Sequence, residues 1–190
     1  MVETGKYNVL YTSGEIETRI KSMATHINSY HKESPLKSTW VCVLDGGYRF
    51  FSDITRYLAF DAHVDFCKVT SYTGTEKSGN TRLQRFTDAD GNDLHIEPNQ
   101  RIYIFDDIAD SGETAKLIAE YYEANGAPVE LVLCTCARRK TTPVEELRKY
   151  YSEVWSLFEL EDEWLVGYGM DNPHGYMRQI PSILKMKNDD

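Results

Sequence analysis

One stretch near the middle of the chain says most about how it folds: Ile104-Phe105-Asp106-Asp107-Ile108-Ala109-Asp110-Ser111-Gly112-Glu113-Thr114. The apolar run 101–105 that enters it has the length of a buried strand, and residues 114–125 have the spacing of an amphipathic helix. A buried strand that passes through a short turn into a helix is typical of α/β proteins with a mainly parallel sheet. Ligands bind at the carboxyl ends of the strands in such sheets, so we expect a site at this turn.

The chemistry of this turn favours a phosphorylated sugar. Residues 110–114 lie at a helix N-terminus, where free backbone N–H groups and the helix dipole attract a phosphate. Gly112 lets the backbone approach such a group closely, and two hydroxyl side chains add donors. The adjacent carboxylates of Asp106 and Asp107 repel each other unless hydroxyls or a cation lie between them, which suits ribose hydroxyls or a metal ion.

The alternative is an ordinary strand-to-helix turn in which Asp110 or Ser111 caps the helix. The apolar strand and the acidic pair before the turn favour a binding site over this interpretation. The turn is not a P-loop, because the lysine of G-x-x-x-x-G-K-[ST] is missing, and it has no G-x-G-x-x-G triplet.

The elements on either side continue the alternation of helices and strands. Apolar spacing predicts helices over 14–30, near 50–58 and over 144–150, and strands over 40–44, 64–70, 129–136 and 154–158. Residues 71–100 are polar and glycine-rich, which is typical of a lid or binding loop. A β-hairpin with a polar tip is the alternative there and is compatible with a lid. We expect the aromatic tail 164–184 to be irregular.

Composition excludes several classes of protein. With 190 residues and 41% hydrophobic residues, the chain can bury the core of one domain without disulfides or metals. Its four cysteines lie in apolar runs without CxxC spacing, which predicts buried free thiols and a cytoplasmic protein. Residues 1–15 lack the apolar run of a signal peptide, and we expect no membrane span. The net charge of −9 argues against a broad nucleic-acid surface.

The stretch 104–114 resembles the donor-binding motif of type I phosphoribosyltransferases. That motif is a hydrophobic strand, two acids, two small or apolar residues and then Asp-Thr/Ser-Gly-x-Thr. By this resemblance Asp106 and Asp107 hold the ribose hydroxyls of phosphoribosyl pyrophosphate, and the following turn wraps its 5′-phosphate. The turn residues so implied are Asp110, Ser111, Gly112, Glu113 and Thr114.

Four further segments resemble the hypoxanthine-guanine members of this family, in the family's order and over roughly residues 10–182. Val43–Asp53 resembles a first loop that contacts pyrophosphate, and Asp65–Tyr72 resembles the start of a mobile lid. Trp164–Asp171 resembles the base-binding segment, and Tyr176–Arg178 resembles a segment whose arginine reaches pyrophosphate. These matches imply Asp45, Gly46, Gly47, Ser71, Tyr72 and Arg178 as donor-binding residues, and Trp164, Leu165 and Asp171 as base-binding residues.

The resemblance also implies an architecture. It predicts a single domain over 1–190, with a core of about 10–160 whose mainly parallel sheet is flanked by helices. A lid of about 71–100 and a small hood, the C-terminal segment of about 161–190, complete it. Oligomers are common in the family, so we expect a homodimer or homotetramer.

The implied reaction joins the ribose 5-phosphate of phosphoribosyl pyrophosphate to a 6-oxopurine, namely hypoxanthine, guanine or xanthine. Asp110 is the expected catalytic base for the purine N7 proton. Mg²⁺ is the expected cofactor, with Asp171 as its ligand and the acids 106 and 107 reached through the ribose hydroxyls. Most members carry a lysine that donates to the purine O6. Arg138 best matches that place, and a shift by one residue to a neighbour is the alternative.

Two other functions stay open at this point. A pyrimidine in place of the purine is one, and the match over Trp164–Asp171 argues against it. The other is a regulator that keeps this fold, senses the donor and binds nucleic acid. Such a protein needs a basic surface, against which the net charge of −9 argues.

Overall fold

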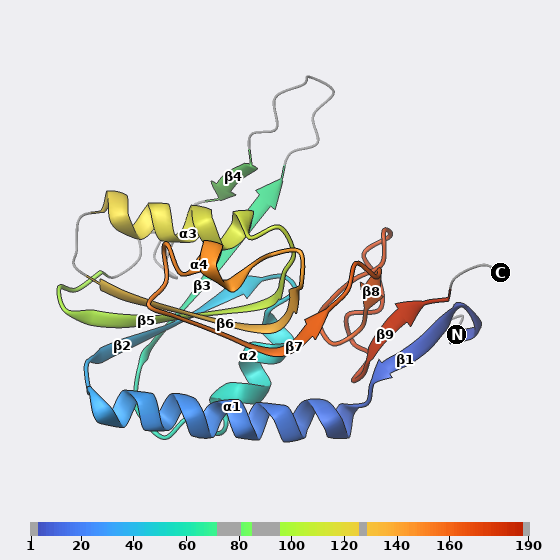
Figure 1. The fold of residues 1–190 in the computed structure, drawn as a ribbon, viewed down its shortest axis with the longest axis horizontal. Helices are drawn as coiled ribbons and strands as arrows, with labels where there is room; N and C mark the ends of the chain where they lie inside the picture. Colours follow the sequence, from blue (N-terminus) through green and yellow to red (C-terminus); the bar gives the residue numbers. More distant parts are fainter. Residues whose placement is uncertain (1–3, 72–80, 85–95, 126–128, 188–190) are drawn as a thin grey trace.

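The computed structural model describes residues 4–71, 81–84, 96–125 and 129–187, and for 70, 71 and 81–84 it describes the backbone alone. A six-stranded core sheet carries helices on both faces, and a three-stranded sheet lies beyond one end of its strands (Figure 1). The core strands are β2 (Lys37–Leu44), β3 (His63–Ser71), β4 (Thr81–Gln84), β5 (Gln100–Ala109), β6 (Val129–Arg139) and β7 (Glu153–Leu160). The helices are η1 (Thr4–Lys6), α1 (Ser13–Glu33), α2 (Tyr48–Thr55), α3 (Glu113–Ala124) and α4 (Val144–Leu147).

The strand order of the core sheet explains where a ligand can bind. The order is β4-β3-β2-β5-β6-β7, and all neighbours are parallel except β4, which runs antiparallel to β3. From β2 the chain proceeds to β3 on one side, and then returns to β5 on the other side. Loops that leave the carboxyl ends of β2 and β5 therefore diverge, and this switch point is where open parallel sheets bind ligands.

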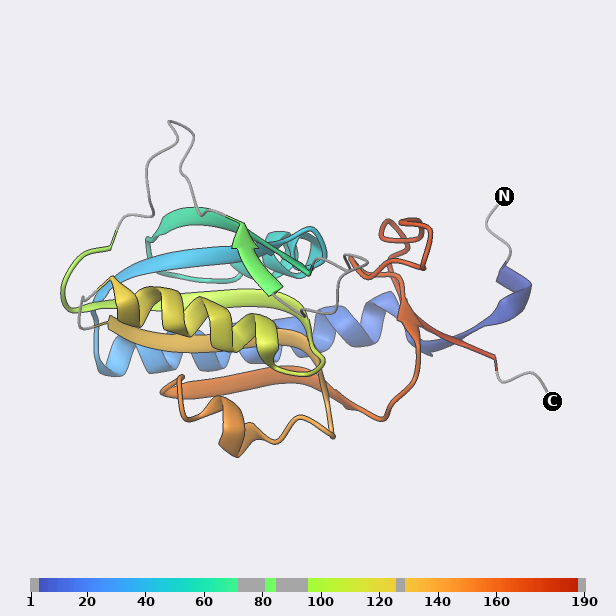
Figure 2. The same cartoon turned by 90° about the horizontal axis from the view of Figure 1, so that it is seen from above.

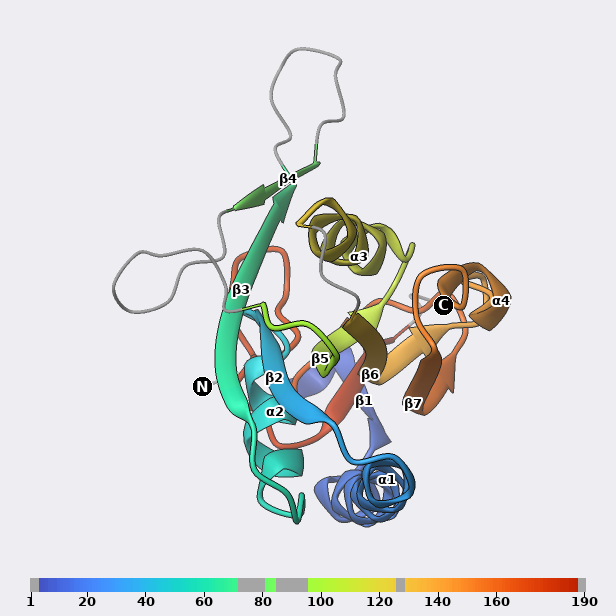
Figure 3. The ribbon, with the colours of Figure 1, turned by 90° about the vertical axis from the view of Figure 1, so that its left-hand side faces the viewer.

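Both faces of the core sheet are buried, which explains the continuous apolar runs in the sequence. On β5, Tyr103 and Phe105 pack with α1 and α2, whereas Ile102 and Ile104 pack with α3 and α4 (Figure 3). Helix α1 contributes the apolar stripe that its spacing predicts. Its buried residues are Ile16, Ile20, Met23, Ala24 and Ile27.

Strands of the hood join the N-terminal end of the described chain in a small antiparallel sheet. Its strands are β1 (Tyr7–Tyr11), β8 (Leu165–Val166) and β9 (Ile183–Met186), in the order β1-β9-β8. Figure 2 shows this sheet beside the end of the core from which the β2–α2 loop leaves. The tail is therefore more regular than its sequence indicates, and the N-terminal strand was not predicted at all.

The predicted fold class is confirmed, and within the core sheet the differences concern the ends of strands. β5 continues through the acids to Ala109, and β6 continues to Arg139, because the two strands go on pairing as far as Ala109 and Arg138. β2 begins at Lys37, three residues before the predicted strand over 40–44. The backbones of β3 and β4 pair as a hairpin, and the expected lid tip between them lies outside the described residues.

Two expectations from composition can be compared with this fold. All four cysteines are free and buried, as predicted: Cys42, Cys67, Cys134 and Cys136. Among the helices that the structure describes, none combines the length and the apolar character needed to cross a membrane.

Candidate functional site

The β2–α2 loop, Asp45–Gly47, lies directly against the acids at the end of β5. A Cβ atom on Gly46 would stand 1.8 Å from Oδ2 of Asp107, and one on Gly47 would stand 2.9 Å from the carbonyl oxygen of Phe105. Any larger residue would overlap β5 at these distances, so glycine is required for the approach. The loop that is expected to contact pyrophosphate therefore touches the acids that are expected to hold the ribose hydroxyls.

Asp45 has a cationic partner that the sequence analysis did not single out. Nζ of Lys68 on β3 donates to Oδ2 of Asp45 at 2.7 Å, and the peptide bond before Asp45 is cis. Both side chains are about half exposed, so the pair adds little to stability. Its importance is electrostatic, because it offsets an acid beside a loop expected to meet a polyanion.

The acid pair, Asp106 and Asp107, occupies the last part of β5. Oδ1 of Asp106 accepts from the backbone N–H of Asp107, and Oδ1 of Asp107 accepts from that of Ile108, both at 2.9 Å. Burial, and then the charge of Asp107, raises the pKa of Asp106 well above its usual range. Burial also raises the pKa of Asp107, although hydrogen bonds and the charge of Arg178 oppose it. Hydroxyl donors or a cation would relieve this repulsion.

The phosphate turn, Asp110–Thr114, opens helix α3. Gly112 occupies the N-cap position at φ 82°, where a glycine is favoured, and it provides no side-chain cap. Oγ of Ser111 accepts from the backbone N–H of Glu113 at 3.3 Å. The alternative in which Asp110 or Ser111 is the N-cap residue is therefore not met, and the first turn of α3 presents backbone N–H groups at the positive end of its dipole.

The hood meets both the loop and the acid pair. A Cβ atom on Gly169 would stand 2.1 Å from the carbonyl oxygen of Gly46. Nη1 of Arg178 donates to the carbonyl of Gly169 at 2.6 Å, and Nη2 donates to Oδ2 of Asp171 at 2.7 Å. The charge of Arg178 also opposes the rise in the pKa of Asp107, so this hood arginine lies within electrostatic reach of the acid pair.

The two base-binding candidates at the start of the hood differ in exposure. Trp164 is 55% exposed, whereas Leu165 in β8 is 6% exposed. A large exposed indole is a suitable surface for stacking a heterocycle, whereas Leu165 can offer only its backbone. Sequence-predicted residues from β2, β5, α3 and the hood thus gather at the carboxyl ends of the core strands.

Comparison with known proteins identifies the family of this arrangement. A family model described as a phosphoribosyl transferase domain matches residues 6–173. This chain belongs to the phosphoribosyltransferase family. A hypoxanthine-guanine phosphoribosyltransferase of Aquifex aeolicus is 31% identical, over 96% of this chain and 96% of the relative. A hypoxanthine-guanine-xanthine phosphoribosyltransferase of Tritrichomonas foetus is 26% identical, over 94% of this chain and 91% of the relative.

Solved structures of the family share the fold. A hypoxanthine phosphoribosyltransferase from Staphylococcus aureus superposes with a TM-score of 0.76 at 22% identity, over 98% of this chain and 95% of that one. One from Trypanosoma cruzi gives a TM-score of 0.77 at 22% identity, over 95% and 91% of the two chains. At this identity the likeness concerns the fold alone.

The family's base-contacting lysine was matched to Arg138, and in the structure that side chain is held by other contacts. Nη1 of Arg138 donates to the carbonyl of Thr142 at 2.6 Å, and Nη2 pairs with Glu159. Successive side chains of a strand point to opposite faces, so Arg138 and its neighbour cannot both face the site. The contacts of Arg138 are those of a residue that holds a turn to a neighbouring strand.

Arg139 is the arginine that faces the phosphate turn. Its Nε donates to Oδ1 of Asp110 at 2.9 Å, and its Nη1 donates to the carbonyl of Glu161 at 2.6 Å, where the hood begins. The guanidinium therefore spans the gap between the expected catalytic base and the expected base-binding segment. The sequence alone could not choose between the two arginines, because β6 was predicted to end before both.

The remaining predicted site residues concern the lid and the metal. Ser71 ends β3, its side chain is not described, and Tyr72 lies outside the described residues. Within the described ranges, no three His, Cys, Asp or Glu side chains gather to hold a metal ion. Mg²⁺ commonly binds one or two carboxylates together with substrate phosphates and water. The acid pair and Asp171 suit an ion that arrives with a polyphosphate substrate.

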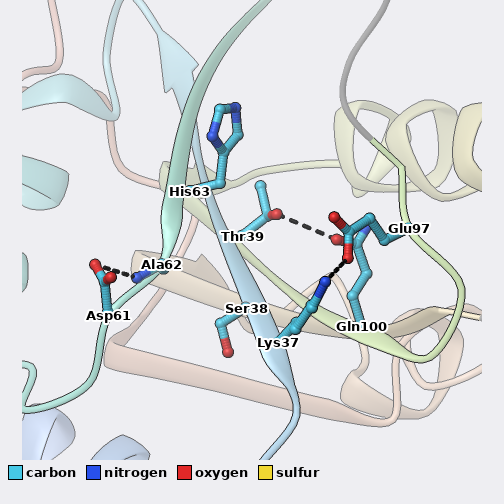
Figure 4. A pocket seen from close by; sticks show the side chains of 8 residues that line it. All are labelled: Lys37, Ser38, Thr39, Asp61, Ala62, His63, Glu97 and Gln100. Carbon is cyan, nitrogen blue, oxygen red and sulfur yellow. Dashed lines mark hydrogen bonds and ion pairs between the residues drawn. The ribbon is translucent and has the colours of Figure 1, made fainter.

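A pocket of about 340 Å³ opens at the other end of the core strands (Figure 4). Its lining contains an ion pair between Lys37 and Glu97, and a hydrogen bond of 3.3 Å from Oγ1 of Thr39 to Oε1 of Gln100. It is bounded by the amino ends of β2, β3 and β5, away from the acid pair and the phosphate turn. The candidate site is therefore located by the convergence of polar groups at the carboxyl ends of the strands, and this pocket lies apart from it.

Proposed function

We propose that this chain joins the ribose 5-phosphate of phosphoribosyl pyrophosphate to a 6-oxopurine and releases pyrophosphate. The observation that carries the proposal is the contact of three segments around the acid pair. The β2–α2 loop lies against Asp107, the phosphate turn follows on the same strand, and the hood lies against Gly46. The relatives' printed names, which include hypoxanthine, guanine and xanthine, support a purine as the acceptor.

The donor would lie along the carboxyl ends of β2 and β5. The acid pair would accept hydrogen bonds from the two ribose hydroxyls. These bonds would offset the burial that raises both pKa values and the repulsion by Asp107 that further raises the pKa of Asp106. The backbone N–H groups of the phosphate turn would bind the 5′-phosphate. Pyrophosphate would lie at the β2–α2 loop, with Lys68 and Arg178 as the nearby cations. These local positive charges would attract the polyanion although the whole chain has a net charge of −9.

The base would lie between the hood and the phosphate turn. Stacking on Trp164 would contribute ~1–3 kcal/mol, by analogy with other base–aromatic contacts. Leu165 and Asp171 would contact the 2-position side of the ring. We assign to Arg139 the hydrogen bond to the purine O6. Arg139 reaches Asp110, whereas Arg138 binds Glu159 and Thr142.

The transfer breaks the bond from ribose C1 to the pyrophosphate oxygen, and the bonding electrons leave with pyrophosphate. The purine N9 forms the new bond to C1, and the proton on N7 passes to the carboxylate of Asp110. A general base in this position typically contributes about 10²–10⁴-fold. Mg²⁺, with Asp171 and the acid pair as its nearest carboxylates, would offset the charge that develops on pyrophosphate.

The proposal includes several finer points. A lid over about 71–100 would exclude water, which otherwise hydrolyses the donor. We also propose a homodimer or homotetramer. The four buried free cysteines support a cytoplasmic location.

The test is a nucleotide-formation assay with phosphoribosyl pyrophosphate and Mg²⁺, in which hypoxanthine, guanine, xanthine, adenine and uracil are offered separately. We expect product from one or more of the 6-oxopurines, and none after addition of a chelator. Product from uracil alone would overturn the choice of base. A folded protein that binds the donor and makes no product from any base would instead favour the nucleic-acid regulator.

A further inference from the structure

The base-binding end of the hood turns back sharply on itself. In this hood turn, Gly167–Met170, the first three residues all have positive φ, at 87°, 49° and 99°. The middle one is Tyr168, an L-residue with a large side chain, which rarely adopts this conformation. Backbone bonds hold the turn, since the N–H of Tyr168 donates to the carbonyl of Ile180 at 2.8 Å. An unfavourable backbone conformation persists only where surrounding contacts fix it.

The side chain of Tyr168 provides such a contact. It is 2% exposed, and its hydroxyl donates to Oδ2 of Asp53 at 2.8 Å. Asp53 lies on α2, where Nε of Arg49, one turn earlier, is 3.4 Å from the same carboxylate oxygen. The guanidinium of Arg49 also lies 5.8 Å from the centroid of the Tyr168 ring. One side of α2 thus holds the tip of the hood turn through hydrogen bonding and charge.

Helix α2 is also the continuation of the β2–α2 loop. Gly47 is its N-cap residue, so the loop and the binding point for Tyr168 lie on one rigid element. The backbone of Gly169, next to Tyr168, presses on the carbonyl oxygen of Gly46. The hood turn and the loop are therefore joined twice, once by backbone contact and once by the hydroxyl of Tyr168.

We infer that the hydrogen bond from Tyr168 to Asp53 is a positioning contact, which sets the distance between the base-binding hood and the donor-binding β2–α2 loop. The catalytic consequence rests on the proposed function. The base and the donor occupy opposite sides of this contact, so a change in their separation acts on the transfer step more than on the binding of either substrate. Neither Tyr168 nor Asp53 needs to touch a substrate.

A pocket lies beside the hydrogen bond from Tyr168 to Asp53, so the packing of neighbouring side chains does not hold Asp53 in place when the bond is lost. A pocket of about 320 Å³ borders Arg49, Asp53, Arg56 and Tyr168. The carboxylate of Asp53 has a second cation within reach there, because Nη1 of Arg56 lies 3.8 Å from its Oδ1. Without the tyrosine hydroxyl, the carboxylate has room and a partner for turning outward, so we expect the hood turn to loosen.

The test compares Tyr168→Phe with Tyr151→Phe. Tyr151 is also 2% exposed, and its hydroxyl donates to the carbonyl of Ala115 at 2.7 Å on the other face of the core sheet. Both variants lose one hydroxyl and one buried hydrogen bond, so a general loss of stability is matched. We expect hydrogen exchange in the hood turn and at Gly47 to accelerate about 10-fold in Tyr168→Phe and to stay at the parent rate in Tyr151→Phe.

Steady-state kinetics provide the second readout. In Tyr168→Phe, kcat should fall about 10-fold while both KM values change less than about threefold, and Tyr151→Phe should keep its kcat. Asp53→Asn retains an oxygen acceptor and should keep most of the activity, whereas Asp53→Leu should behave as Tyr168→Phe does.

Two results would overturn the inference: equal exchange in the two tyrosine variants, or equal kcat values in an active enzyme. Exchange is measured without substrate, so it decides the positioning contact even if the parent makes no nucleotide. Failure of the proposed function and failure of this inference are thereby distinguishable.

Discussion

Replacement of Gly46 by alanine tests the arrangement of the candidate site most directly. The new methyl group would begin 1.8 Å from Oδ2 of Asp107, and ordinary contact begins at 3.4 Å, so the two groups must separate by about 1.6 Å (3.4 minus 1.8 Å). The obstacle is the end of a partly buried side chain, so Asp107 moves more easily than the backbone. Folding should survive while the acid pair is displaced.

The expected result is a large loss of activity with a small loss of stability. A misplacement of about 1 Å can cost about 100-fold in rate, so kcat/KM for phosphoribosyl pyrophosphate should fall about 100-fold or more. The melting temperature should fall by only a few degrees, roughly 2–4 °C per kcal/mol for a chain of this size. The assay is initial-rate kinetics at saturating base, together with thermal melts.

Gly14→Ala provides the matched control. Gly14 lies in the first turn of α1, and nothing lies within 4 Å of a Cβ placed there. This variant should keep full activity, and it should gain up to ~1 kcal/mol of stability from helix propensity. Asp107→Asn should reproduce the kinetic loss of Gly46→Ala without the steric change. A folded Gly46→Ala enzyme with kcat/KM within about threefold of the parent would refute the reasoning.

Three further changes test other parts of the site. Trp164→Ala should raise KM for the base about 10-fold or more, because it removes a stacking surface worth ~1–3 kcal/mol; an equal rise in KM for the donor would contradict stacking. Arg139→Ala should lower kcat/KM for the base about 10–100-fold, whereas Arg138→Ala should chiefly lower the melting temperature, and the reverse pattern would return the base contact to Arg138. Asp106→Asn should raise the melting temperature at pH 7, since folding raises the pKa of Asp106 and the native state therefore loses stability as pH rises from about 3.9 towards the folded pKa. Thermal melts should show that gain vanishing near pH 4, and a gain independent of pH would exclude the carboxylate charge as its cause.

Much of the core could be predicted because its signals are local. The run that enters Asp106 alternates between two buried faces, and α1 carries a regular apolar stripe, so periodicity identifies both. The ends of β5 and β6 could not be predicted in the same way. Aspartate is disfavoured in strands, and two arginines end the apolar run of β6. Pairing between the neighbouring strands nevertheless continues through Ala109 and Arg138.

The hood shows where local signals are insufficient. β8 contains two residues, Leu165 and Val166, which is too short for any periodic pattern. β1 is half exposed, and its partner β9 lies at the far end of the sequence. The motif over Trp164–Asp171 identified the segment, but its sheet depends on a pairing that no window of sequence contains.

The pairing of β1 with β9 also affects the order in which parts of the fold can form during synthesis. Tyr7 pairs with Met186, and β8 joins that sheet only through β9. A chain leaves the ribosome N-terminal end first, so the strands that carry the acid pair and the phosphate turn emerge while β1 still lacks its neighbour. In a nascent chain the expected sugar-phosphate half of the site therefore emerges before β9, the strand on which the sheet of the expected base-binding half depends.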